Sequence, residues 1–404
     1  MKIVVLKFGG TSVGTIGKIK KVANIIGNYR KKNYKVIVVS SAMSGVTNDL
    51  IKKSRQISKN FSESEYDVLV SSGEQVACSL IAGRLKYNGF KSRSWLGWQI
   101  PILTQGPHKN SRINQINKNK IISYLKEGGI PIITGFQGLN NDQRITTIGR
   151  GGSDASAIML AKFFKAQRCV IYTDVEGVYT TDPNKFNKAK KIKVISYEEM
   201  LEMASLGAKV MQPVSIQDAR LNRIDIEVKS SFIKKSGTLI TKKSNIINSK
   251  IVTGITSTYN DSKVTLVGVK DKPGVAASIF KPLSTNSINV DMVVQNISAN
   301  GKETDLTFTI KTEDLNKTRK IIRENKRIKF RKLLFDKGVS KISIIGVGMI
   351  TTPGVTFRMF QALANKRINI QVISTSEIKI SVLVNKKDTK KALMVLHKEF
   401  KLNK

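Results

Sequence analysis

The chain has 404 residues, of which 40% are hydrophobic, so it can bury a full core and form two or three domains. Its formal net charge of +40 would normally suggest a nucleic-acid partner. The lysines, however, are spread along the whole sequence among many Asn and Ile residues, as in proteins from AT-rich genomes. We therefore expect solvated surfaces that steer anionic substrates, and no nucleic-acid partner.

The sequence also argues against membrane insertion and secretion. No apolar run approaches the roughly 18 to 20 residues of a membrane span. The apolar stretch that follows Lys2 is too short for the core of a signal peptide. Cys78 and Cys169 lack metal-type spacing and fit a reducing compartment better than a disulfide framework. We expect a cytoplasmic protein with no membrane partner.

Residues 1–241 alternate apolar strands with helices. A strand is expected at 2–8, a helix at 19–29 and a second strand at 35–42, and helix–strand pairs follow at 116–134 and 154–175. Uniformly apolar strands that alternate with helices indicate an α/β domain with a mostly parallel sheet covered on both faces. This pattern predicts a first domain over 1–241.

A polar, aperiodic linker at 242–250 precedes an internal repeat, in which residues 264–295 are echoed by 342–374. Each copy reads strand, Pro-Gly-Val turn, helix, Ile-Asn, strand, and the Pro-Gly pairs lie 80 residues apart. We expect a linker with the first strand of this region at 242–262, and two small α+β modules at 263–335 and 336–404.

The first strand ends in "KFGGTSVG" (7–14), where adjacent glycines would let backbone amides approach an anion at a helix start. Lys7 precedes the glycines, whereas a P-loop has its lysine after them. The same segment matches the nucleophile elbow Gly-x-Ser-x-Gly, which would make Ser12 a hydrolase nucleophile. That alternative needs a histidine, and the chain has only His108 and His397. An ordinary strand-to-helix turn is the other alternative.

Two further segments carry candidate substrate contacts. "SSAMSGVTN" (40–48) follows the second strand and offers Ser41 and Thr47, because ligands of parallel sheets sit beyond the carboxyl ends of the strands. "SSGEQVA" (71–77) is expected to place Glu74 at a helix start, where its carboxylate could receive a substrate ammonium group. Helix capping and the helix dipole are the purely structural alternatives.

"TTIGRGGSDASA" (146–157) combines a fixed charge with backbone freedom at the mouth of a helix. Arg150 could hold a carboxylate through two hydrogen bonds, and the amides of Gly151 and Gly152 could reach a phosphate. Asp154 could orient a cation or the lysine, although Ser153 and Asp154 could also be simple helix caps. A dinucleotide site is disfavoured, because Asp154 stands where the third glycine of that fingerprint belongs.

Together these segments resemble aspartate kinase of the amino-acid kinase superfamily. The resemblance is carried, in family order, by "KFGGTSVG", "SSAMSGVTN", "SSGEQVA", "GFQG" (135–138), "TTIGRGGSDASA", "YTDVEGVYTTDP" (172–183), "EEMLEMASLGAKV" (198–210) and "GTLIT" (237–241). The repeat looks like two ACT regulatory domains, with "DKPGVAA", "INVDMVVQN", "PGVT" and "ISTSEIKISVLV". The fold implied is a three-layer αβα kinase domain followed by two ferredoxin-like (βαββαβ) ACT domains.

The resemblance implies transfer of a phosphoryl group from ATP, with Mg2+, to L-aspartate. Lys7 and Asp154 correspond to the catalytic residues, and Ser41, Thr47, Glu74 and Arg150 to the aspartate contacts. The ATP contacts fall on Lys7, Phe8, Gly9, Gly10, Gly151, Gly152, Ser153, Thr173, Asp174, Tyr179 and Lys209. No protein side chain is expected to bind the metal, which arrives with ATP. Asn184 stands where the family usually has an arginine after "TTDP", so the sequence departs from the family pattern at that nucleotide contact.

The resemblance also implies feedback inhibition by lysine, threonine or both, and a homo-oligomer formed through the ACT domains. The effector positions that carry over are Asp271, Gly274, Ala276, Asn289, Asp291, Gln295, Thr356, Asn369 and Ser374. A kinase for glutamate or acetylglutamate is the nearest rival, and paired ACT modules argue against it. A non-catalytic amino-acid sensor and an RNA-binding protein are rivals from other classes. The phosphate-handling segments argue against the sensor, and the missing aromatic signature strand argues against RNA binding.

Overall fold

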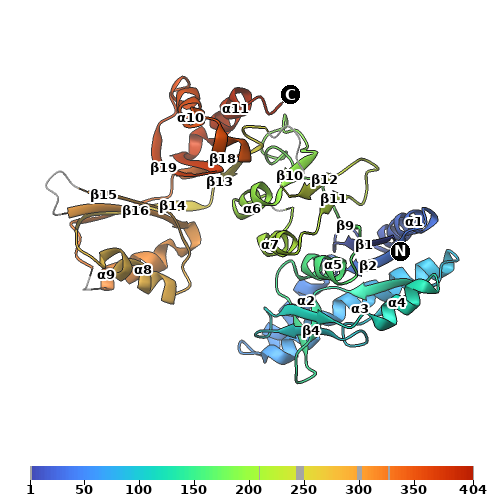
Figure 1. Ribbon diagram of the computed structural model, residues 1–404. Helices are drawn as coiled ribbons and strands as arrows, with labels where there is room; N and C mark the ends of the chain where they lie inside the picture. Colours follow the sequence, from blue (N-terminus) through green and yellow to red (C-terminus); the bar gives the residue numbers. More distant parts are fainter. Residues whose placement is uncertain (1, 209, 243–249, 298–302, 326–327, 404) are drawn as a thin grey trace. The chain divides into compact units, whose positions relative to one another are not determined.

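The computed structural model describes residues 2–208, 210–242, 250–297, 303–325 and 328–403 (Figure 1). The chain divides into two compact units. The first unit contains Met1–Val178 and Lys191–Asn248, and the second contains Tyr179–Lys190 and Ser249–Lys404. The chain therefore leaves the first unit after Val178, contributes a short segment to the second, and returns.

The first unit is an α/β structure with an eight-stranded sheet in the order β10-β12-β11-β9-β1-β2-β6-β3. Every described pairing in this sheet is parallel except β11 with β12, so the predicted mostly parallel sheet is confirmed. The remaining strands form a four-stranded sheet in the order β5-β4-β7-β8. The elements are β1 (Ile3–Phe8), α1 (Ile16–Lys31), β2 (Lys35–Ser40), α2 (Val46–Ile57), α3 (Glu63–Tyr87), β3 (Ser92–Trp95), β4 (Ile102–Gln105), β5 (Arg112–Ile116), α4 (Asn119–Lys126), β6 (Ile130–Thr134), β7 (Gln137–Leu139), β8 (Ile145–Thr147), α5 (Gly152–Phe163), β9 (Arg168–Thr173), β10 (Val194–Ser196), α6 (Tyr197–Ser205), α7 (Pro213–Asn222), β11 (Ile226–Ser230) and β12 (Thr238–Thr241).

Strand β1 is central to this sheet and buried on both faces. Its alternate residues Val4, Leu6 and Phe8 pack in one core with the apolar sides of α1 and α3. Because successive side chains of a strand point to opposite faces, Lys7 lies on the other face, which α5 covers. This alternation places the Lys7 side chain between the sheet and α5, where Asp154 lies.

The second unit contains two four-stranded antiparallel sheets, as the two ACT modules require. One has the order β15-β16-β14-β17 and the other β13-β18-β20-β19. The elements are β13 (Gly254–Thr258), β14 (Asp261–Lys270), α8 (Val275–Thr285), β15 (Val290–Ile297), β16 (Glu303–Lys311), η2 (Thr312–Asp314), α9 (Leu315–Glu324), β17 (Lys332–Asp336), β18 (Val339–Ile345), η3 (Val347–Thr351), α10 (Val355–Ala364), β19 (Ile370–Ser376), β20 (Lys379–Asn385), η4 (Lys386–Asp388) and α11 (Thr389–Glu399).

The two modules differ in the sequence position of one edge strand, β17 in the first module and β13 in the second. The first module runs β14-α8-β15-β16-α9-β17 in sequence, the predicted βαββαβ order. The second module ends with helix α11, and its outer strand is β13, which precedes the whole first module in the sequence. Strand β13 pairs with β18 over Gly254–Thr258. The first module is therefore inserted between two parts of the second.

The segment 179–190 is held by this outer strand. The amide of Ile255 in β13 donates to the carbonyl of Thr180 at 2.7 Å. The Nζ of Lys185 donates to the carbonyl of Ser257 at 2.9 Å. The ring of Phe186 packs against His397 of α11, with centroids 4.6 Å apart. A segment that lies between β9 and β10 in sequence is thus part of the second unit.

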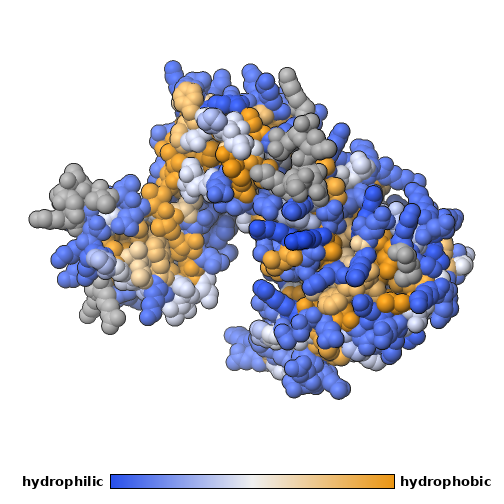
Figure 2. All heavy atoms as spheres, in the orientation of Figure 1, coloured by the Kyte–Doolittle hydropathy of each residue, from blue (hydrophilic) through white to orange (hydrophobic). Residues whose placement is uncertain are grey.

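The surface agrees with the dispersed charge of the sequence. Figure 2 shows hydrophilic residues spread over the visible faces of both units, with apolar patches between them. None of the helices among the described residues combines the length and apolar character needed to span a bilayer.

Candidate active site

The central polar contact of the first unit joins β1 to the first turn of α5. The Nζ of Lys7 lies 2.7 Å from Oδ1 of Asp154, and each residue is 8% exposed. The two opposite charges form an ion pair. Burying a charge is costly without a partner, so the two opposite charges are placed together, at the edge of a cavity that both residues line.

The glycines after β1 leave room for the lysine head group. A Cβ at Gly9 would lie 3.3 Å from Nζ of Lys7, and a Cβ at Gly10 would lie 2.9 Å from the carbonyl oxygen of Ala42. The second distance is shorter than real side chains tolerate. Glycine at position 10 therefore permits the close approach of the loop that follows β2.

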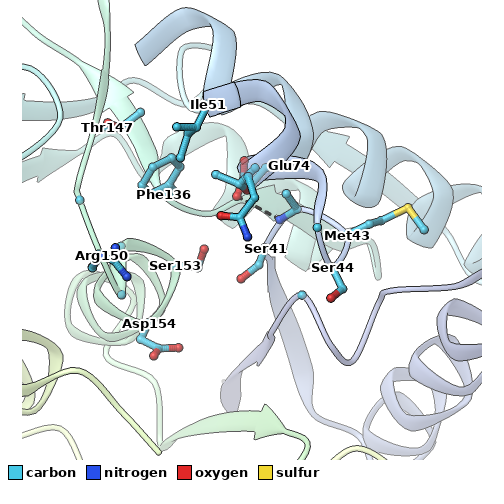
Figure 3. A pocket seen from close by; sticks show the side chains of 18 of the residues that line it. Ser41, Met43, Ser44, Ile51, Glu74, Phe136, Thr147, Arg150, Ser153 and Asp154 are labelled. Atoms are coloured by element: carbon cyan, nitrogen blue, oxygen red, sulfur yellow. Dashed lines mark hydrogen bonds between the residues drawn. The ribbon is translucent and has the colours of Figure 1, made fainter. Parts of the chain in front are cut away.

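Glu74 lines the cavity next to this loop. Its Oε1 accepts a hydrogen bond from the amide of Ala42 at 3.0 Å, drawn as a dashed line in Figure 3. Its Oε2 is buried and has no hydrogen-bond partner among the described residues. Burial raises the pKa of Glu74 to about 7, against the lowering effect of the Ala42 hydrogen bond. One carboxylate oxygen is thus available for a cationic ligand.

The expected position of Glu74 at a helix start is wrong. Glu74 lies in the middle of α3, which runs from Glu63 to Tyr87. The residues that α3 buries include polar and small ones such as Asp67, Ser71 and Gly73, so the helix start was not marked by an apolar stripe. The dipole of α3 therefore does not hold the Glu74 carboxylate in place. The hydrogen bond from the Ala42 amide does.

Arg150 stands on a turn between two glycines in the left-handed region. Gly149 has a φ of 78° and Gly151 a φ of 77°, values that favour glycine. Gly151 is the N-cap of α5 and has no side-chain cap, so Ser153 and Asp154 are not capping residues. Arg150 itself is exposed, and among the described residues it has no ion-pair partner. Its guanidinium is available to a ligand.

One cavity of about 540 Å³ joins these groups. Figure 3 shows Arg150, Ser153 and Asp154 on one side, at the entrance of α5, and Ser41, Met43 and Ser44 on the loop after β2. Of the residues predicted from sequence, the lining includes Lys7, Gly10, Ser41, Thr47, Glu74, Arg150, Gly151, Gly152, Ser153 and Asp154. The cavity is also lined by Asn48, Phe136 and Thr147, which lie in the quoted motifs but were not predicted individually, and by four residues that the sequence missed: Ile51, Arg55, Tyr66 and Lys109. These four residues lie outside the recognised motifs.

The arrangement suits a small zwitterion beside a phosphate. Glu74 offers a carboxylate oxygen, Arg150 a cation with two-pronged geometry, and Lys7 a buried cation next to the glycines that follow β1. Among the described residues, no three His, Cys, Asp or Glu side chains cluster closely enough to hold a metal ion.

Comparisons with known proteins agree with this chemistry. The amino acid kinase family matches residues 2–230, and the ACT domain matches 264–325 and 342–400. An aspartate kinase of Pseudomonas putida is 44% identical over 405 residues, covering 100% of this chain and 98% of its own length. Aspartokinase 2 of Bacillus subtilis is 41% identical, covering 100% of this chain and 99% of its own length. The chain belongs to the aspartate kinases.

A solved structure of the same family supports the fold over the whole chain. Aspartokinase III of E. coli with aspartate and ADP, described as the R-state, matches with a TM-score of 0.77 and 26% identity, over 98% of this chain and 99% of that one. The same enzyme with lysine and aspartate, described as the T-state, matches with a TM-score of 0.82 over 99% and 100%. Aspartate kinases are phosphotransferases, so the chain is an enzyme that uses ATP.

The nucleotide positions expected for an aspartate kinase are not all gathered in the cavity. Thr173 is the last residue of β9, which pairs with β1 in the sheet. Its hydroxyl donates to the carboxylate of Asp174 at 3.1 Å. The Phe8 side chain is buried and stacks on Tyr172 with ring centroids 4.8 Å apart, so only its backbone can face a ligand. Tyr179 belongs to the second unit. Lys209 lies outside the described residues.

The expected effector positions lie in the two ACT modules. Gly274 is the N-cap of α8 with a φ of 86°, Ala276 follows it in α8, and Asp271 precedes it. Asn289 and Asn369 are exposed just before β15 and β19, Gln295 is exposed on β15, Thr356 is exposed on α10, and Ser374 lies on β19. Equivalent positions of the repeat thus occupy equivalent places in both modules.

Asp291 differs from the other effector positions because it already has a partner. Its carboxylate forms an ion pair with the Nζ of Lys341, which lies on β18 of the other module. Burial works to raise the pKa of Asp291, but the hydrogen bond and charge of Lys341 outweigh it and lower the pKa. An effector ammonium group at Asp291 would have to compete with this internal cation.

Proposed function

We propose that the chain transfers the γ-phosphoryl group of ATP to the side-chain carboxylate of L-aspartate, giving ADP and 4-phospho-L-aspartate. This reaction is the first step of lysine, threonine and methionine biosynthesis. The observation that carries the proposal is the cavity that joins Lys7, Glu74 and Arg150. Its charges match those of an amino acid with a second acidic group next to a phosphate.

The substrate would be bound by two oppositely charged residues. Glu74 would receive the ammonium group on its unpartnered Oε2, and Arg150 would hold the α-carboxylate. Ser41 and Thr47 supply hydroxyl groups at the same cavity. N-acetylglutamate has no ammonium group and would leave Glu74 a buried carboxylate without a cation, which favours a free amino acid as substrate.

The chemistry then requires positioning and charge neutralisation more than proton transfer. A carboxylate oxygen of the substrate attacks the γ-phosphorus, and the bond from that phosphorus to the bridging oxygen of ADP breaks, with its electrons leaving on ADP. The attacking carboxylate is already ionised, since its intrinsic pKa is about 4. No general base is needed, in keeping with a cavity whose lining contains no histidine. Lys7, fixed by Asp154, would stabilise the charge of the phosphoryl group in transit.

The nucleotide side of the proposal uses backbone and one metal ion. Gly9 and Gly10 provide the close approach that phosphates need, together with Gly151 and Gly152 at the start of α5. Mg2+ bound to the phosphate oxygens of ATP would supply further positive charge. The nucleoside is proposed to contact Thr173, Asp174, Tyr179 and Lys209. The proposed location of the protein is the cytoplasm, which is reducing and supplies ATP.

Regulation is proposed to act through the ACT modules. Lysine and threonine together are expected to inhibit, with the oligomer formed through the same modules. The amides of the Pro-Gly-Val turns would meet the effector carboxylate, and Asp291 and Gln295 its polar groups.

The test is formation of aspartyl hydroxamate from ATP, Mg2+, aspartate and hydroxylamine by the purified full-length chain. Glutamate and N-acetylglutamate replace aspartate in parallel reactions. We expect hydroxamate with aspartate and at least about tenfold less with the other two acids, which is about 1.4 kcal/mol of discrimination. Equal rates with glutamate, or a rate only with N-acetylglutamate, would refute the substrate assignment.

A further inference from the structure

Asp67 is a fully buried carboxylate on the same helix as Glu74, two turns earlier. Its Oδ2 lies 2.7 Å from Nδ1 of His108 and accepts from the amides of Lys109 and Thr147, each at 3.1 Å. Its Oδ1 accepts from the hydroxyl of Thr147 at 2.6 Å and the amide of Lys109 at 3.2 Å. No substrate-facing motif contains Asp67, and it does not line the cavity.

All of these hydrogen bonds reach two segments that border the cavity. Thr147 ends β8, three residues before Arg150, and both Thr147 and Lys109 line the cavity. The two segments also hold each other, because the amide of Ser111 donates to the carbonyl of Thr147 at 3.0 Å. A Cβ at Gly149 would lie 3.0 Å from the carbonyl oxygen of Lys109, so the turn before Arg150 rests on the 107–111 loop.

This arrangement has a consequence for Arg150. Its exposed side chain has no ion-pair partner among the described residues, so its location depends on the backbone that carries it. That backbone is fixed on one side by α5 and on the other by Thr147 and Gly149. A buried acidic side chain is seldom the most stabilising choice for a core position. Its hydrogen bonds do, however, specify one geometry, which apolar contacts would not.

We propose that Asp67 is a positioning residue for the reaction: it holds the Thr147–Arg150 turn where Arg150 can bind the α-carboxylate of the amino-acid substrate. The proposal rests on the proposed function, because it assumes that Arg150 makes that contact. Asp67 touches neither substrate nor nucleotide and acts only through the turn.

The proposal is tested with Asp67→Asn in the full chain. The amide nitrogen of Asn cannot accept a hydrogen bond. At either oxygen position it would face the amide N–H of Lys109, because that amide donates to both oxygens of Asp67. We expect the KM for aspartate to rise about tenfold or more, because two donors facing each other disrupt the buried hydrogen bonds that hold the turn, while kcat and the KM for ATP change less than about threefold. Thr147→Val removes one hydrogen bond, keeps the shape of the side chain, and should raise the same KM by a smaller factor. It replaces Asp67→Asn if that variant does not fold.

Glu199→Ala is the control for a loss of stability in the same unit. Glu199 is also a buried carboxylate of the first unit, and with Ser196 it forms the capping box of α6. This change should lower the melting temperature and leave the KM for aspartate unchanged. If Asp67→Asn lowers the melting temperature without a selective rise in that KM, Asp67 is structural only and the proposal is wrong.

A double-mutant cycle with Arg150→Lys separates this proposal from the proposed function. Arg150→Lys alone should raise the KM for aspartate, because lysine cannot grip a carboxylate with two parallel hydrogen bonds. Adding Asp67→Asn should then raise it less than about threefold further, because the turn no longer carries an arginine. Independent, multiplying effects would overturn the positioning role. No selective effect of Arg150→Lys would instead overturn the substrate assignment of Arg150.

Discussion

Glu74 combines a hydrogen-bonded oxygen with an unpartnered one in a buried position, and its pKa of about 7 follows from that burial. A carboxylate that is half protonated near neutral pH gains most from a cation that arrives with the substrate. The free enzyme must lose the Glu74 proton before it can pair with an ammonium group. Substrate binding and ionisation of Glu74 are therefore coupled.

The first prediction is a pH dependence of aspartate binding. Below pH 7 the fraction of ionised Glu74 falls, so kcat/KM for aspartate should decrease toward tenfold per pH unit, and above pH 7 it should level off. Glu74→Gln should raise the KM for aspartate about tenfold or more and flatten this profile. Initial rates between pH 5.5 and 8.5 measure both effects. Glu127→Gln is the control, because Glu127 is an exposed carboxylate that forms an ion pair with Lys91. An unchanged profile in Glu74→Gln would contradict the assignment.

The second prediction concerns the Lys7–Asp154 pair. Lys7→Ala should lower kcat by about 100-fold or more, since the loss of one contact to developing charge costs about 2.7 to 4 kcal/mol. It should also lower the melting temperature, because Asp154 would remain buried without its cation. Steady-state kinetics and thermal unfolding of the same samples measure the two losses. A variant that keeps more than about a tenth of wild-type kcat would rule out the phosphoryl-stabilising role.

At the scale of elements, the entrance of α5 depends on a glycine with positive φ. A Cβ at Gly151 would lie 2.6 Å from Cγ of Gln212, in addition to the strain of its φ of 77°. Gly89 has a φ of 82° with open space around a Cβ, so Gly89→Ala carries the strain alone. The third prediction is that Gly151→Ala lowers both kcat and the melting temperature. Gly89→Ala should cost only about 1 to 2 kcal/mol of stability and leave kcat intact. Equal effects of the two changes would mean that the Gln212 contact is irrelevant.

The segment 179–190 gives the second unit a titratable contact. The Nε2 of the buried His397 lies 3.2 Å from the Thr180 hydroxyl, and burial lowers the pKa of His397 to about 4. Its unfolded pKa is about 6.5, so between pH 6.5 and 4 the unfolded chain binds more protons than the folded one. Stability should therefore fall as the pH drops through this window, by at most about 1.4 kcal/mol per unit.

The fourth prediction uses His397→Gln, which keeps a polar side chain but does not titrate. Denaturant unfolding of the second unit should show the stability of the wild type falling between pH 6.5 and 4.5 by more than that of the variant. The difference between the two proteins cancels the titration of other groups. Parallel pH dependence in both would show that His397 does not titrate in this window.

At the scale of the whole molecule, the two ACT modules are joined in sequence and in structure, since β13 completes the second module and Lys341 of that module binds Asp291 of the first. The fifth prediction is that lysine and threonine together inhibit more strongly than either alone, with a coupling of about 1 to 3 kcal/mol. Gln295→Ala should relieve inhibition and leave the uninhibited kcat nearly unchanged. Hydroxamate assays with each amino acid and with both measure this. An untouched wild-type rate at saturating lysine plus threonine would refute the regulatory proposal and leave the kinase assignment standing.

The sequence by itself determined the features that local patterns encode. Apolar strands, the glycine turn after Lys7 and the 80-residue repeat depend on neighbouring residues, so they identified the parallel sheet, the motifs and the paired modules. The tertiary structure alone decided which polar groups meet. The contact of Glu74 with Ala42 spans 32 residues, and that of Asp67 with Thr147 spans 80. The pairing of β13 with β18 and the placement of 179–190 in the second unit likewise join segments that are far apart in the sequence. Periodicity reports which face of an element is buried, but not which distant side chain it meets there, because that depends on how the whole chain packs.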